Sequence, residues 1–134
     1  MKKLIASVLV LIMVLGICTT SFATKFNKTV QCVNENDYVK SATSDEKLDD
    51  DFAIYVHYNA KNCSNKYTNH FRGYCAETGE KEGQKWVVPG STIPIQGSGF
   101  SFGWRYYLTM RGNTRYHENE NRSKIKLEGW FLAN

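Results

Sequence analysis

Residues 100–110 constrain the fold of this chain more than any other stretch. Large apolar side chains stand there at every second position, and smaller or polar residues fill the positions between them. This period of two is typical of a long β-strand with one buried face, whereas a helix would repeat every three to four residues. The pattern predicts a central core strand whose buried residues are Phe100, Phe102, Trp104, Tyr106, Leu108 and Met110.

Other segments show the same alternation. Residues 52–58 and 67–76 both alternate and are separated by a polar stretch, which predicts a hairpin with Phe71 on an inward face. Residues 124–131 predict a closing strand, and Pro94 predicts an edge strand or a bulge because proline donates no ladder hydrogen bond. The acidic segment 43–51 is expected to be an exposed loop.

The first 23 residues predict an export signal. Lys2 and Lys3 precede the apolar run 4–17, and Ser21-Phe22-Ala23 forms a cleavage site with small residues. We therefore expect a secreted protein whose mature chain begins at Thr24. Acylation at Cys18 is the alternative, but the bulky Ile17 before this cysteine fits a lipoprotein signal poorly.

The composition after residue 23 favours strands over helices. The 17 aromatic residues outnumber the 14 leucines, isoleucines and valines together, and such side chains suit a pleated surface. We expect one all-β domain over residues 24–134, an antiparallel β-sandwich, with a small β-barrel as the alternative. The modest net charge of +2 over these residues argues against a nucleic-acid binder.

Three cysteines remain after the signal, an odd number for an exported protein. Cys63 lies near the tip of the predicted hairpin and Cys75 lies far along its second strand. The two are therefore not expected to meet. We expect a disulfide between Cys32 and Cys75 and a free thiol at Cys63, although three reduced thiols are also compatible with the sequence.

The sequence contains no recognisable catalytic, cofactor-binding or metal-binding motif. His57, Cys63, His70 and Cys75 are zinc-type ligands, but they lack the usual spacing. The acidic loop lacks the pattern of a calcium-binding loop. We therefore expect a protein that is not an enzyme and carries no cofactor.

The remaining functional signal is a basic surface on the last two predicted strands. Residues 83–134 carry a net charge of +4, and the outward positions of these strands combine cations with aromatic rings. Such a surface suits an anionic cell-envelope polymer, a glycan or a membrane surface. Its predicted members are Arg105, Tyr107, Arg111, Lys124, Lys126 and Trp130.

The signal and the segments YYLTMRGN and KIKLEGWF resemble small exported proteins of Gram-positive bacteria whose function is unknown. The resemblance covers the signal and about the last third of the chain. Some exported proteins of this size and class act as bacteriocins on the cell envelope. We therefore expect a binding module at the envelope, with a bacteriocin-like antibacterial protein as the alternative.

Overall fold

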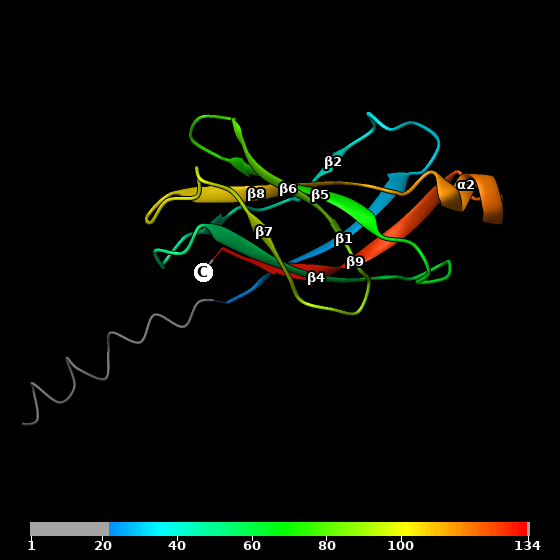
Figure 1. Ribbon diagram of the computed structural model, residues 1–134, viewed down its shortest axis with the longest axis horizontal. Coiled ribbons are helices and arrows are strands. Elements are labelled where there is room, and N and C mark those ends of the chain that lie inside the picture. The colour runs from blue at the N-terminus through cyan, green and yellow to red at the C-terminus, as the bar shows by residue number, and fades with distance from the viewer. Residues whose placement is uncertain (1–21, 134) are drawn as a thin grey trace, which may run out of the picture.

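The computed structural model describes residues 22–133 and shows two antiparallel sheets packed face to face (Figure 1). Sheet A has the strand order β1-β9-β4-β7. Its strands are β1 (Thr24–Gln31), β4 (Ala53–Ala60), β7 (Ile93–Gln96) and β9 (Lys124–Leu132). The predicted signal 1–23 lies outside the described residues except for its last two positions. The first strand begins at Thr24.

Sheet B has the strand order β2-β8-β5-β6, and β3 pairs with a further part of β8. Its strands are β2 (Val39–Lys40), β3 (Asp45–Glu46), β5 (Asn69–Cys75), β6 (Lys81–Val87) and β8 (Arg105–Arg111). A single short helix, α2 (Arg115–Glu120), connects β8 to β9 within the described residues and lies at one end of the molecule. The described chain is therefore all-β apart from this one turn of helix, as the sequence predicts.

The two sheets share one core that is rich in aromatic side chains. Its largest fully buried apolar members include Tyr58 and Phe131 from sheet A, Phe71 and Tyr106 from sheet B, and Tyr116 from α2. The Tyr58 hydroxyl donates a hydrogen bond to the Val87 carbonyl oxygen at 2.7 Å, so even a polar atom in this core is satisfied across the sheets. The aromatic composition thus supplies the core that leucines would fill in a helical bundle.

The strand predicted over residues 100–110 begins only at Arg105. Gly103 has a φ of +79°, and the Trp104 amide bonds back to the Ser101 carbonyl, so the chain turns where the prediction had it extended. Phe100, Tyr106, Leu108 and Met110 are buried as predicted, but Phe102 is 62% exposed and Trp104 is 44% exposed. The prediction that Trp104 is buried is wrong.

The predicted hairpin of residues 52–76 is also wrong. β4 pairs with β7 and β9 in sheet A, whereas β5 pairs with β6 and β8 in sheet B. The polar connection between them is long enough to cross the roughly 10 Å that separates two packed sheets. Phe52 continues the alternation of the buried Ile54 and Val56, but it precedes β4 and is 64% exposed.

The other strand predictions fare better. Ile125, Leu127 and Phe131 of β9 are fully buried, and Pro94 lies in β7, which forms the edge of sheet A.

The acidic segment 43–51 is not a simple exposed loop, because Lys47 within it is completely buried. Its ammonium group contacts Asp49 and Asp51 and donates a hydrogen bond to the Ala133 carbonyl oxygen.

Candidate functional site

The outer face of sheet B carries the densest group of cations and rings. Its side chains alternate with the buried residues of β5 and β8 and form three rows across the strands. We call this surface the cationic aromatic face. Its rows are Trp86, His70 and Arg111 with Tyr38 beside them; Arg72, Thr109 and Lys40; and Lys81, Tyr74 and Tyr107.

Tyr38 lies beside Arg111 at the end of the first row although it precedes β2. Its ring centroid is 3.8 Å from Cζ of Arg72. Arg111 Nε donates a hydrogen bond to the Tyr38 oxygen at 3.0 Å, and the same oxygen is 2.7 Å from His70 Nδ1. The one Tyr38 oxygen therefore links the Arg111 guanidinium to the His70 imidazole.

Further rings complete the face. Cζ of Arg111 lies 4.8 Å from the Trp86 ring, and that ring meets the His70 ring edge to face at 5.0 Å. The Tyr74 and Tyr107 rings are parallel within 7°, and Nζ of Lys40 lies 3.6 Å from the Tyr107 centroid. Cations over ring faces are attracted by the ring quadrupole, so the aromatic side chains hold the charges in place.

The electrostatics of this face are one-sided. It has four cations and no carboxylate, and the ion pairs of the described residues involve none of Lys40, Arg72 and Arg111. Burial of the imidazole, together with the nearby Arg111, Arg72 and Lys81, lowers the pKa of His70 to about 4. The histidine is therefore neutral at pH 7 and adds no positive charge.

The face also contains unsatisfied hydrogen-bonding groups. In residues 22–133, three buried side-chain polar atoms have no hydrogen-bond partner, and all three lie here: Arg72 Nε, Thr109 Oγ1 and an Arg111 Nη. Thr109 is directly opposite Arg72 in the pairing of β5 with β8. Buried polar atoms are almost always paired in native proteins, so these three mark a part of the face where hydrogen-bonding capacity is left unused.

The surface predicted from the last two strands does not exist as one patch. β8 belongs to sheet B and β9 to sheet A, so their outward residues lie on opposite outer faces of the molecule. Tyr107 and Arg111 are part of the cationic aromatic face. Arg105 bonds instead to Ser44 and lies 3.7 Å from Glu46. Lys124, Lys126 and Trp130 lie on the far side.

Of the ten residues of this face, only Tyr107 and Arg111 were predicted from the sequence. The eight that were missed are Tyr38, Lys40, His70, Arg72, Tyr74, Lys81, Trp86 and Thr109. A signal was present, because His70, Arg72 and Tyr74 alternate with Phe71 and therefore point outward. What the sequence did not reveal was the pairing of β5 with β8, which brings these residues beside Arg111.

The predicted disulfide between Cys32 and Cys75 is also wrong. All three described cysteines are free thiols, and these two lie at opposite ends of the molecule. Cys75 pairs with Tyr106 at the start of β8, whereas Cys32 Sγ is next to Gly112 beyond its end. Six residues of strand are roughly 20 Å, far beyond the reach of a disulfide. Cys63 is half-buried, and burial raises the pKa of Cys32 to about 11.

The possible metal ligands of the sequence are dispersed. His57 is in β4 of sheet A and His70 is in β5 of sheet B. Among the described residues, no three histidine, cysteine or acidic side chains are grouped as metal ligands would be. In the acidic segment, the Lys47 ammonium lies between the carboxylates.

Comparison with known proteins adds no relatives. No family model, no curated protein and no solved structure matches this chain. Over residues 22–133, none of the helices has the length and apolar character needed to cross a lipid bilayer.

Proposed function

We propose that this chain is an exported β-sandwich protein that binds an anionic polymer of the cell envelope and catalyses no reaction. The observation that carries the proposal is the gathering of Lys40, Arg72, Lys81 and Arg111 on the cationic aromatic face, which has no carboxylate. None of Lys40, Arg72 and Arg111 takes part in an ion pair within residues 22–133. An anion with several oxygen atoms would pair with these guanidinium and ammonium groups.

The shape of the face favours a polymer over a small anion. The cationic side chains come from β2, β5, β6 and β8, and they are spread over the sheet surface instead of converging on one cavity. A chain with repeated phosphate or carboxylate groups could contact Lys40, Arg72 and Lys81 at the same time. Flat exposed rings such as Trp86, which is 42% exposed, offer apolar contact between these charges.

The experiment that tests this function measures binding to poly(glycerol phosphate) at several NaCl concentrations. The double variant Lys40→Gln/Arg72→Gln should bind about tenfold more weakly and with a smaller salt dependence, because two charge contacts are lost. The matched control, Lys124→Gln/Lys126→Gln, removes the same charge from the outer face of sheet A. It should bind like the unmodified protein, and equal losses in both variants would refute the assignment to sheet B.

A membrane is the other anionic partner that this experiment must distinguish. Vesicles of phosphatidylglycerol should bind more weakly than the polymer, since the Tyr107 and Tyr38 rings pack against Lys40 and Arg72 of the same face. Tighter binding to the vesicles than to poly(glycerol phosphate) would contradict the proposal.

Export is tested separately from binding. The intact mass of protein recovered from culture medium should correspond to a chain that begins at Thr24. A mass that includes residues 1–23, or an acylated cell-bound form that begins at Cys18, would contradict export by cleavage after Ala23.

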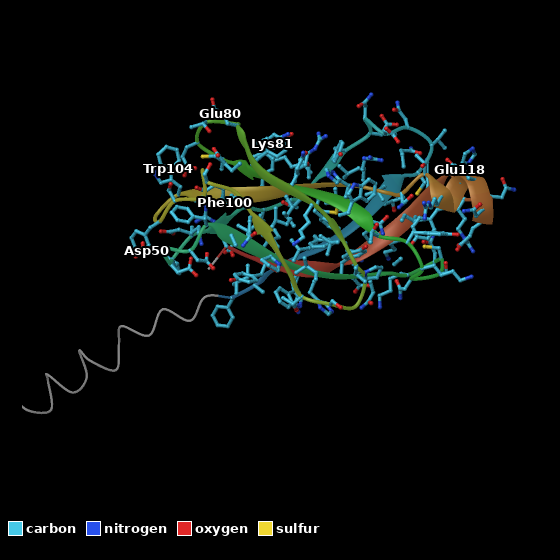
Figure 2. All side chains as sticks on the ribbon, viewed as in Figure 1. Asp50, Glu80, Lys81, Phe100, Trp104 and Glu118 are labelled. Carbon is cyan, nitrogen blue, oxygen red and sulfur yellow. The ribbon has the colours of Figure 1, made fainter. Side chains whose placement is uncertain are left out.

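One observation favours the second candidate function, a bacteriocin-like antibacterial protein. Phe52, Phe102 and Trp104 are exposed, and they lie in loops near one end of the molecule, where Figure 2 places Trp104 and Asp50. The two loops are joined by backbone hydrogen bonds between Lys47 and residues 103–104. Exposed large rings at a loop tip could enter a membrane. Loss of vesicle leakage in Phe102→Ser/Trp104→Ser, with polymer binding unchanged, would support this function.

A further inference from the structure

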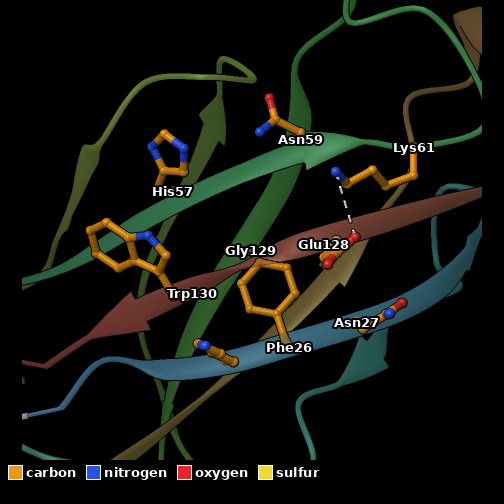
Figure 3. A pocket seen from close by; sticks show the side chains of 9 residues that line it. Phe26, Asn27, His57, Asn59, Lys61, Glu128, Gly129 and Trp130 are labelled. Carbon is orange, nitrogen blue, oxygen red and sulfur yellow. Dashed lines mark ion pairs between the residues drawn. The ribbon is translucent and has the colours of Figure 1, made fainter.

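The outer face of sheet A contains an open groove of about 480 Å³, on the opposite side of the molecule from the cationic aromatic face (Figure 3). Side chains of β1, β4 and β9 line it. Gly129 of β9 belongs to its floor. A Cβ at this position would lie 2.0 Å from the His57 carbonyl oxygen, so only glycine allows β9 to approach β4 this closely.

One side of the groove is an aromatic platform. His57 and Trp130 are register partners on β4 and β9, and their rings are parallel within 10° with centroids 5.5 Å apart. Figure 3 shows the rings side by side, each with a face toward the viewer. Both side chains are partly exposed. Together they form a flat apolar surface that a planar ligand could cover.

The other side of the groove is polar but almost neutral. Asn27 and Asn59 contribute amides whose side chains make no hydrogen bond within the described residues. Lys61 and Glu128 form an ion pair at 3.7 Å and are each about half exposed. With Lys25, which also lines the groove, the net charge is only +1, so a polyanion gains little here.

We infer that this groove binds a neutral β-1,4-linked glycan, a ligand class distinct from the anionic polymer of the other face. The C–H groups of a pyranose ring carry partial positive charge and pack on the negative faces of aromatic rings. Adjacent sugars of a flat chain would cover His57 and Trp130. The sugar hydroxyl or acetamido groups would then hydrogen-bond to Asn27, Asn59 and the Glu128 carboxylate.

The experiment is calorimetric titration of the purified protein with chitohexaose and with cellohexaose. We expect saturable binding of at least one of them, and about tenfold weaker binding by Trp130→Ala, because the larger ring of the platform is lost. Asn59→Ala tests the polar side of the groove without removing a core side chain. Absence of saturable binding by both oligosaccharides would overturn the inference.

Trp86→Ala is the matched control, because it removes an indole from the cationic aromatic face instead. It should bind the oligosaccharides as the unmodified protein does, and an equal loss in this variant would also overturn the inference. Neutral glycan binding should not weaken between 50 mM and 500 mM NaCl, whereas polymer binding to sheet B should. The two proposals can therefore fail independently.

Discussion

The Tyr38 hydroxyl lies 2.7 Å from Nδ1 of His70 and joins the segment before β2 to the middle of sheet B. The same oxygen accepts a hydrogen bond from Arg111 Nε. This one phenol therefore links an imidazole to a guanidinium group on the candidate binding face.

Tyr38→Phe tests this relationship. The variant keeps the ring over Arg72 but leaves Arg111 Nε and His70 Nδ1 without their partner, so the free energy of unfolding should fall by about 1–3 kcal/mol. Urea unfolding at pH 7.5 measures the change. Tyr107→Phe is the control, since its hydroxyl makes no hydrogen bond within residues 22–133. An equal effect of both substitutions would contradict the assigned role.

Stability should depend on pH through His70. Its pKa is about 4 in the folded protein and near 6.5 in the unfolded chain, so the unfolded state binds the proton first. Stability is therefore complete above pH 6.5 and falls as pH decreases toward 4, by roughly 3 kcal/mol in total. Urea unfolding at pH 7.5, 6 and 5 should show this loss, and His70→Asn should show a flatter profile. An equally steep profile in the variant would assign the loss to other groups.

The core position of β8 is Tyr106, not Trp104. The Tyr106 side chain is fully buried, and its hydroxyl donates to the Gly99 carbonyl oxygen at 3.1 Å. Tyr106→Ala should lower the free energy of unfolding by about 3–5 kcal/mol, whereas Trp104→Ala should cost less than about 1 kcal/mol. Comparison of the urea midpoints decides between them. A larger loss of stability in Trp104→Ala than in Tyr106→Ala would instead indicate that Trp104 is the buried residue, as the alternation predicts.

Lys47 connects the acidic segment to the last described residues. Its side chain is fully buried and bonds to Asp49, Asp51 and the Ala133 carbonyl oxygen. Lys47→Ala should lower the free energy of unfolding by about 2–5 kcal/mol, because it removes a fully buried side chain together with its hydrogen bonds. Lys124→Ala, at an exposed position of β9, should change it little. Thermal unfolding of the two variants at equal pH checks the difference.

The sequence alone was enough to predict the fold class and much of the core. The alternation in residues 106–110 and 125–131 places Tyr106, Leu108, Ile125 and Phe131 inside, and all four are fully buried. Alternation succeeds in these segments because a strand with one face in a core sends successive side chains to opposite sides. Alternation failed at Phe102 and Trp104. The large residues alternate through this segment, but the backbone turns at Gly103 and is not a strand there.

Only the tertiary structure decided which strands are neighbours, and the candidate sites depend on that decision. The alternation of residues along one strand predicts which way each side chain points. Which strands pair, however, is set by contacts between residues far apart in the chain. β5 therefore lies beside β8, where Arg72 meets Thr109, instead of beside β4 in a hairpin. For the same reason Trp130 lies beside His57 on sheet A and is separated from Arg111 by the whole thickness of the core.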